Sequence, residues 1–233
     1  MLVALSAALA SASEPPAEGP KAAPNTAVEA CQKVQEPKIA ILACNALLAG
    51  ADKDMAWAWN NLGLALAGRG DMISALEAYG NALSADPTFA PAYSNRGNAH
   101  AALGDMIPAL ADHSRAVEID PKYVSAWHNR GVDHEEMGAY EKALADYRKA
   151  LSLEPAHPGS LTGIATANCK LGRVTASAKA RLAAIEKGGI DPTAFQRLLQ
   201  TEGFYKGPID GIFGKGSRAA LRAWTWRGCL PPA

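Results

Sequence analysis

Five histidines are the residues of this chain best suited to binding a metal or transferring a proton, and their positions argue against both roles. The run His134-Glu135-Glu136 lacks the second histidine, four residues away, that a zinc-protease helix requires. His100 and His134 lie 34 residues apart, and His113 lies 34 residues from Tyr79. The histidines therefore belong to a repeated framework, and the sequence predicts no metal site, no cofactor and no catalytic residue.

The framework is a repeat of 34 residues. Trp59-Asn60-Asn61-Leu62-Gly63 returns as Tyr93-Ser94-Asn95-Arg96-Gly97 and again as Trp127-His128-Asn129-Arg130-Gly131. Four further places stay in register, and they hold Gly70, Gly104 and Gly138; Ala75, Ala109 and Ala143; Tyr79, His113 and Tyr147; and the acid–proline pairs at 86–87, 120–121 and 154–155. This pattern resembles the tetratricopeptide repeat (TPR), a helix-turn-helix unit that stacks into a solenoid. The resemblance implies an all-α fold with units near 56–89, 90–123 and 124–157.

Each repeated small residue has a physical role. The glycines at 63, 97 and 131 allow two antiparallel helices to approach closely, whereas the glycines at 70, 104 and 138 end the first helix of each unit. A single unit cannot bury its own apolar stripe, so further units must flank these three. Residues 158–187 read as a degenerate fourth unit that completes an array over 53–187, and residues 25–52 read as a divergent helix pair.

The cysteines suggest two links. Cys31 and Cys44 lie almost symmetrically about the turn of the 25–52 pair, so a disulfide between them is expected. Cys169 lies in the fourth unit and Cys229 near the end of the chain. These two either tie the last segment to the array or remain free thiols.

Composition separates the two ends of the chain from the repeats. The 233 residues carry no net charge, but residues 53–155 hold fourteen acids against nine Lys or Arg, and residues 190–233 hold three acids against six. Nothing in this balance indicates nucleic acid as a partner. Residues 1–12 form a short apolar run with small residues at its end, typical of a secretory signal, and residues 13–24 read as a disordered linker. The run is too short to span a bilayer.

The last segment, 190–230, begins with a new helix signal at Asp191-Pro192. A loop dense in glycine and proline follows from 203 to 214, and a final helix is predicted from about 215 to 227. The run Gly207-Pro208-Ile209-Asp210-Gly211-Ile212-Phe213-Gly214, with a helix on each side, resembles the small three-helix peptidoglycan-binding domain of bacterial cell-wall proteins. Trp224-Thr225 stands where that family usually has Phe-Gln.

This second resemblance implies non-catalytic attachment to peptidoglycan beside the Asp-Gly turn and the last helix. The residues expected to contribute are Tyr205, Asp210, Gly211, Lys215, Arg218, Arg222 and Trp224. Arginine and lysine suit the carboxylates of the peptide stems, and aromatic rings suit sugar or acyl faces. A structural alternative stays open for several of them, with Asp210 and its glycines holding the turn and Trp224 lying in the core.

The TPR resemblance implies a second binding surface, a groove for an extended peptide. The matching positions hold Asn60, Asn61, Leu64, Ser94, Asn95, Asn98, His128, Asn129 and Glu135. Side-chain amides can pair with a peptide backbone, although the same asparagines could instead serve helix packing. The lysines with which chaperone-type repeats hold a terminal carboxylate are missing here, so a different ligand is expected.

Together these features predict a non-catalytic scaffold, periplasmic or otherwise exported, that binds another protein or peptide through its repeats and peptidoglycan through its last domain. Two alternatives remain. In the first, the chain is an auxiliary or regulatory subunit of a cell-wall hydrolase. In the second, it is an interaction protein whose last domain only caps the array. Disulfide formation favours export.

Overall fold

The computed structural model describes residues 26–50 and 55–229, and all the regular secondary structure in them is helical. The signal-like run at 1–12 and the linker at 13–24 lie outside the described residues. The chain divides into two compact units, one ending at Pro121 and the other beginning at Lys122.

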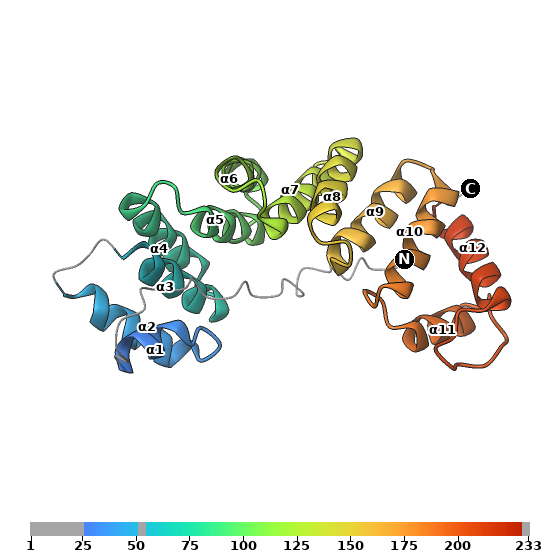
Figure 1. Cartoon of the computed structure of the whole chain (residues 1–233), viewed down its shortest axis with the longest axis horizontal. Coiled ribbons are helices and arrows are strands. Elements are labelled where there is room, and N and C mark those ends of the chain that lie inside the picture. The colour runs from blue at the N-terminus through green and yellow to red at the C-terminus, as the bar shows by residue number, and fades with distance from the viewer. Residues whose placement is uncertain (1–25, 51–54, 230–233) are drawn as a thin grey trace. The chain divides into compact units, whose positions relative to one another are not determined.

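The first unit is built from three helix pairs (Figure 1). Its helices are α1 (Thr26–Gln32), α2 (Pro37–Leu48), α3 (Ala56–Gly68), α4 (Met72–Ala85), α5 (Ala90–Ala102) and α6 (Met106–Ile119). Helix α3 packs on α4 and α5 packs on α6, whereas α2–α3 and α4–α5 contacts join successive pairs. The apolar faces are therefore shared between neighbouring pairs, as expected for stacked repeats.

The second unit continues the same pattern and then departs from it. Its helices are α7 (Val124–Glu136), α8 (Tyr140–Leu153), α9 (Pro158–Lys170), α10 (Val174–Glu186), α11 (Pro192–Thr201) and α12 (Lys215–Cys229). Helices α7–α8 and α9–α10 form pairs, and α12 packs against α10 and α9. Only α11 and α12 lie within residues 190–229, so α10 of the fourth repeat supplies the third helix of the terminal bundle.

Glycines with left-handed backbones separate the two helices of each repeat. Gly70, Gly104, Gly138 and Gly172 have φ between +69° and +85°, a region that strains any residue with a side chain. Each follows directly on the residue that caps the first helix. The glycine therefore specifies a turn at the same position in every repeat.

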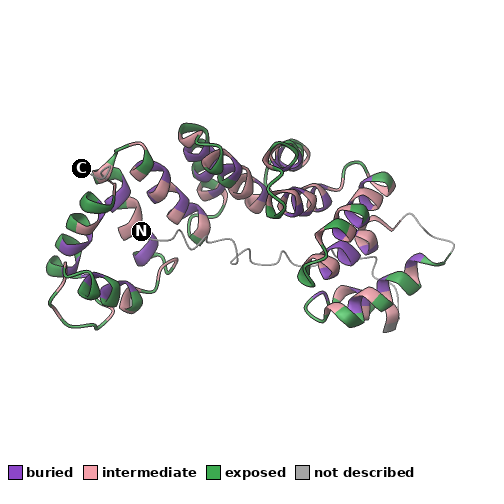
Figure 2. Cartoon of the chain, turned by 180° about the vertical axis from the view of Figure 1, so that it is seen from behind, coloured by how far each residue is buried: buried purple, intermediate pink, exposed green. Residues whose placement is uncertain are grey.

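Buried residues lie where the helices of a pair meet, as the purple faces in Figure 2 show. In the third repeat Tyr147 packs between two glycines. A Cβ atom on Gly131 would lie 2.6 Å from Cε1 of that ring, and one on Gly163 would lie 2.5 Å from Cε2. The ring therefore occupies the space that the missing side chains leave, and it links α7, α8 and α9.

A disulfide holds the amino-terminal helix pair together. Cys31 and Cys44 are bonded, with an S–S distance of 2.00 Å, and both are fully buried against Ala58 and Leu62 of α3. The expected link is confirmed. It closes the turn between α1 and α2 and presents their apolar side to the first repeat.

Candidate binding surfaces

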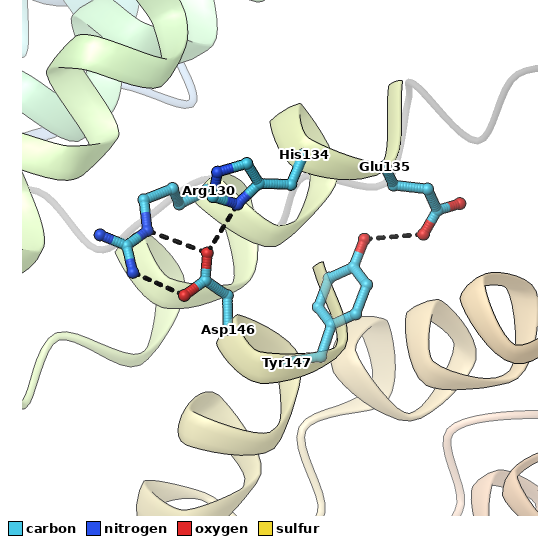
Figure 3. A network of polar contacts seen from close by, with 5 residues as sticks. All are labelled: Arg130, His134, Glu135, Asp146 and Tyr147. Carbon is cyan, nitrogen blue, oxygen red and sulfur yellow. Dashed lines mark hydrogen bonds and ion pairs between the residues drawn. The ribbon is translucent and has the colours of Figure 1, made fainter. Parts of the chain in front are cut away.

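Charged side chains brace the second and third repeats from within. In the third repeat Arg130 donates to both carboxylate oxygens of Asp146, at 2.9 and 2.6 Å, and His134 Nδ1 lies 3.0 Å from Asp146 Oδ2 (Figure 3). Asp146 is buried, so its charge needs these partners. Arg96 and Asp112 form the same bidentate pair in the preceding repeat. These groups are structural.

The groove residues of the first unit are mostly inside the helix stack. Asn60, Asn61, Ser94 and Asn95 are buried, and Asn95 Nδ2 donates to Asn60 Oδ1 at 2.8 Å. Leu64 and Asn98 stay partly exposed, and Asn98 Oδ1 lies 3.1 Å from His113 Nε2. These asparagines therefore serve mainly the packing of α3, α5 and α6. Helix packing was the alternative to peptide binding that the sequence left open.

The groove residues of the second unit are more accessible but also engaged. Tyr147 donates its hydroxyl hydrogen to Glu135 at 2.9 Å, and burial raises the pKa of that carboxyl (Figure 3). The hydroxyl of fully buried Ser160 lies 2.9 Å from His157 Nδ1 and 3.3 Å from His128 Nδ1. Because Ser160 has no solvent access, this serine–histidine arrangement cannot attack a substrate. His128 and Asn129 remain half-buried.

The Asp-Gly turn of the terminal domain closes around one glutamine. Gln196 Nε2 donates to Asp210 Oδ1 at 3.0 Å and to the Ile212 carbonyl at 3.1 Å, and the Gly211 amide donates to Gln196 Oε1 at 2.8 Å. The Gln196 bond, followed by the Ile212 amide, lowers the pKa of Asp210. Sequence reasoning did not single out Gln196, because its partner Asp210 lies fourteen residues away in the chain. Asp210 and Gly211 thus shape the loop.

Two aromatic residues expected to contact peptidoglycan interact instead with other residues of the terminal domain and of α10. Trp224 meets Phe195 edge-on, with 5.4 Å between ring centroids, and the Arg181 guanidinium lies 4.8 Å from the Trp224 ring. Tyr205 donates its hydroxyl hydrogen to the Pro208 carbonyl at 3.0 Å. Trp224 is therefore part of the domain core, and Tyr205 keeps only a partly exposed ring.

Four exposed cations lie along α12. This helix contains Lys215, Arg218, Arg222 and Arg227 and no acidic residue. Arg218 is anchored, because its Nε donates to the Phe213 carbonyl at 2.7 Å and its Nη2 pairs with Glu186 at 2.9 Å. Trp226 is 61% exposed on the same helix and was not among the expected residues. Its spacing of four from Arg222 was a readable signal, since residues four apart share a helical face.

A second disulfide joins the terminal domain to the fourth repeat. Cys169, in the last turn of α9, is bonded to Cys229, the last residue of α12, with an S–S distance of 2.11 Å. Of the two alternatives left by the sequence, the structure has the link. It fixes the end of α12 beside α9 and α10.

The geometry defines a helical-repeat protein with an attached small domain, and comparison with known families agrees. Tetratricopeptide repeat models match residues 58–89, 90–123 and 124–157. The model described as "Putative peptidoglycan binding domain" matches residues 189–232. The chain therefore contains tetratricopeptide repeats followed by a peptidoglycan-binding-type domain. Both parts belong to classes of binding module.

Solved structures share the repeat fold. A crystal structure of MamA aligns with a TM-score of 0.64 at 24% identity, over 72% of this chain and 96% of that one. YrrB, described as a TPR protein with an unusual peptide-binding site, aligns with a TM-score of 0.56 at 19% identity, over 66% and 79%. The first TPR of Spaghetti (RPAP3), bound to an HSP90 peptide, aligns with a TM-score of 0.50 at 25% identity, over 52% and 96%.

No curated protein matches the chain. Among the described helices none combines the length and apolar character needed to cross a membrane.

Proposed function

We propose that this protein is a non-catalytic scaffold of the periplasm that binds a protein or peptide through its repeats and peptidoglycan through its terminal domain. The observation that carries the proposal is the pairing of these two module types in one chain. Two weak sites on one chain raise the local concentration of a partner at the wall, and no bond is made or broken. An accessory role beside a cell-wall hydrolase fits the same arrangement.

Three findings support the proposal. The structure pairs all four cysteines in disulfides, and structural disulfides persist in exported compartments. A TPR of 25% identity is described as bound to an HSP90 peptide, which supports a peptide as the class of ligand for the repeats. Helix α12 contains four exposed basic residues and no acidic one, and basic side chains suit the carboxylates of peptide stems.

Each unit is proposed to contribute its own partner-binding surface at the expected positions that remain accessible. These are Leu64 and Asn98 in the first unit, and separately His128, Asn129 and Glu135 in the second. On the wall side the accessible members are Lys215, Arg218 and Arg222, with the ring of Tyr205. Asp210, Gly211 and Trp224 act by shaping the loop and core beneath them.

Cosedimentation with insoluble peptidoglycan tests the wall-binding half. The intact, oxidised chain is expected to pellet with purified peptidoglycan, and less so as salt rises, because surface charges are screened. Chitin, an insoluble glycan without peptide stems, is the control matrix. Absence of pelleting at every salt concentration would contradict wall binding.

One observation favours a second candidate, in which the terminal domain only caps the repeats. Helix α12 packs on α10, and the disulfide at Cys229 attaches it to α9, so one side of the domain already covers the end of the fourth repeat. Terminal repeats need such a polar cap for solubility. In that case the chain stays in the supernatant while its repeats still bind their partner.

A further inference from the structure

The last repeat and the terminal domain together form a groove. It lies between α10 and α12 and encloses about 520 Å³, within the range of ligand pockets of about 300–1,000 Å³. Ala178, Leu182 and Leu221 give it an apolar lining, and Trp226 forms an exposed aromatic wall. Lys179 comes from α10 and Arg222 from α12. Neither helix alone provides this site.

The free charge in the groove is positive. Lys179 and Arg222 are exposed and have no acidic partner among the described residues, whereas Arg218 is paired with Glu186. Two unpaired cations facing an apolar lining repel each other less when an anion is present between them. An acidic ligand with an apolar part therefore fits this groove.

We infer that the groove between α10 and α12 binds the carboxylated peptide stem of peptidoglycan, with Lys179 and Arg222 holding its carboxylates and Trp226 covering an apolar part of the stem. This assignment rests on the proposed wall binding and makes it more specific. Where a stem is attached, the lactyl carboxyl of the glycan strand is bonded to that stem as an amide, so the strand itself offers these cations no carboxylate there. The ligand is recognised by its peptide, and the fourth repeat is part of the wall-binding site.

The disulfide between Cys169 and Cys229 holds the two walls of the groove together. Helix α12 is attached at its last residue to α9, which pairs with α10. Arg181 of α10 also lies against Trp224 of α12. Reduction frees the end of α12 from α9, so binding of the stem is expected to weaken when these cysteines are reduced.

A competition experiment tests the assignment on the full, oxidised chain bound to insoluble peptidoglycan. The competitors are a disaccharide-tetrapeptide released from peptidoglycan and di-N-acetylchitobiose, a disaccharide of N-acetylated sugars that carries no carboxylate. The tetrapeptide form is expected to displace the protein, and the bare disaccharide is expected to require at least about a hundredfold more, since two charge-assisted contacts are lost. Equal competition by both would overturn the assignment. Equal competition by inorganic phosphate or by duplex DNA would do the same, because either result means general anion binding.

The matched variants locate the site. Lys179→Gln with Arg222→Gln is expected to weaken pelleting at least about tenfold. Lys142→Gln with Lys206→Gln removes the same charge from two other exposed positions and is expected to leave it unchanged. Cys169→Ser with Cys229→Ser weakens binding, and Cys31→Ser with Cys44→Ser does not. If the wild type and the groove variant pellet equally, the assignment of the stem to this groove is wrong, but peptidoglycan binding by the chain is supported. If the wild type never pellets, the proposed function fails.

Discussion

The third and fourth repeats of this protein differ at the residue that packs between helices. In the third repeat Tyr147 is buried between Gly131 and Gly163 and bonds to Glu135. The fourth repeat has Arg181 at the corresponding place, and its guanidinium lies against Trp224 of the terminal domain. The third repeat is thus organised around its own neighbours, whereas the fourth is modified to accept a different domain.

The buried ion pair shows the same contrast. Arg130 and Asp146 brace the third repeat, but the fourth has Ile164 and Ala180 at those places. The first repeat has Leu62 and Ala78, which belong to one apolar cluster. The fold therefore accepts either a complete ion pair or a complete apolar pair here. This comparison predicts which substitutions are costly.

Removing half of the ion pair is expected to have the largest effect. Asp146→Ala leaves Arg130 and His134 without their acceptor and should lower the free energy of unfolding by about 3 kcal/mol. Chemical denaturation followed by far-UV circular dichroism measures it. The double variant Arg130→Leu, Asp146→Ala copies the first repeat and should recover most of the loss. A double variant as unstable as the sum of the two single changes would show that the residues do not act as a pair.

Filling the space beside Tyr147 is expected to rank second. A methyl group in Gly131→Ala would overlap a ring that Gly163 confines from the other side, so stability should fall by about 1 to 2 kcal/mol after the gain in helix propensity. Gly80→Ala in α4 is the control, because its Cβ would meet nothing within 4 Å. That variant should gain up to about 1 kcal/mol. Opposite signs in thermal unfolding are expected, and equal signs would contradict the packing argument.

Breaking the Arg181–Trp224 contact should cost less. Arg181→Ala removes a partly buried cation from the ring, and burial already lowers the pKa of this guanidinium, so the net loss should be about 1 kcal/mol. Thermal unfolding gives the change. Arg222→Ala, on the exposed side of α12, should shift stability by less than about 0.5 kcal/mol. Equal effects of the two would mean that Arg181 does not join the domains.

The smallest effect is a pH dependence at the start of the fourth repeat. The Ser160 amide donates to His157 Nδ1, which must be neutral to accept, and burial lowers the pKa of this imidazole. A depressed histidine pKa gives stability that is complete above the unfolded value of about 6.5 and is lost as pH falls below it. His157→Asn keeps a capping oxygen without a charge. Stability should fall less between pH 7.5 and 5.5 in this variant, as measured by urea denaturation.

Much of the fold could be predicted from the sequence, because the same weak signal recurs at a fixed spacing in several repeats. One glycine predicts little, but Gly70, Gly104 and Gly138 at a fixed spacing predict a helix end in every unit, and all three have the positive φ that this requires. Cys31 and Cys44 were readable because a short hairpin brings its two sides together. The terminal domain was readable from its Asp-Gly turn.

The role of individual polar residues was not readable in the same way. Asn60 and Asn95 resemble ligand-binding amides in the sequence, yet they bond to each other inside the stack. Gln196, which closes the terminal loop, has no neighbouring partner in the chain, because Asp210 lies fourteen residues away. An amide side chain serves packing or binding equally well, and only its surroundings distinguish the two.

The sequence by itself determined the helix-turn-helix units, their spacing and the identity of the terminal domain, because backbone conformation and apolar periodicity are local properties. Only the tertiary structure decided which cations stay free. Lys179 and Arg222 are 43 positions apart in the chain and line one groove, since the fourth repeat packs against the last helix and the bond from Cys169 to Cys229 holds it there. Charge at a surface depends on which partners folding brings within reach, and no local pattern contains that information.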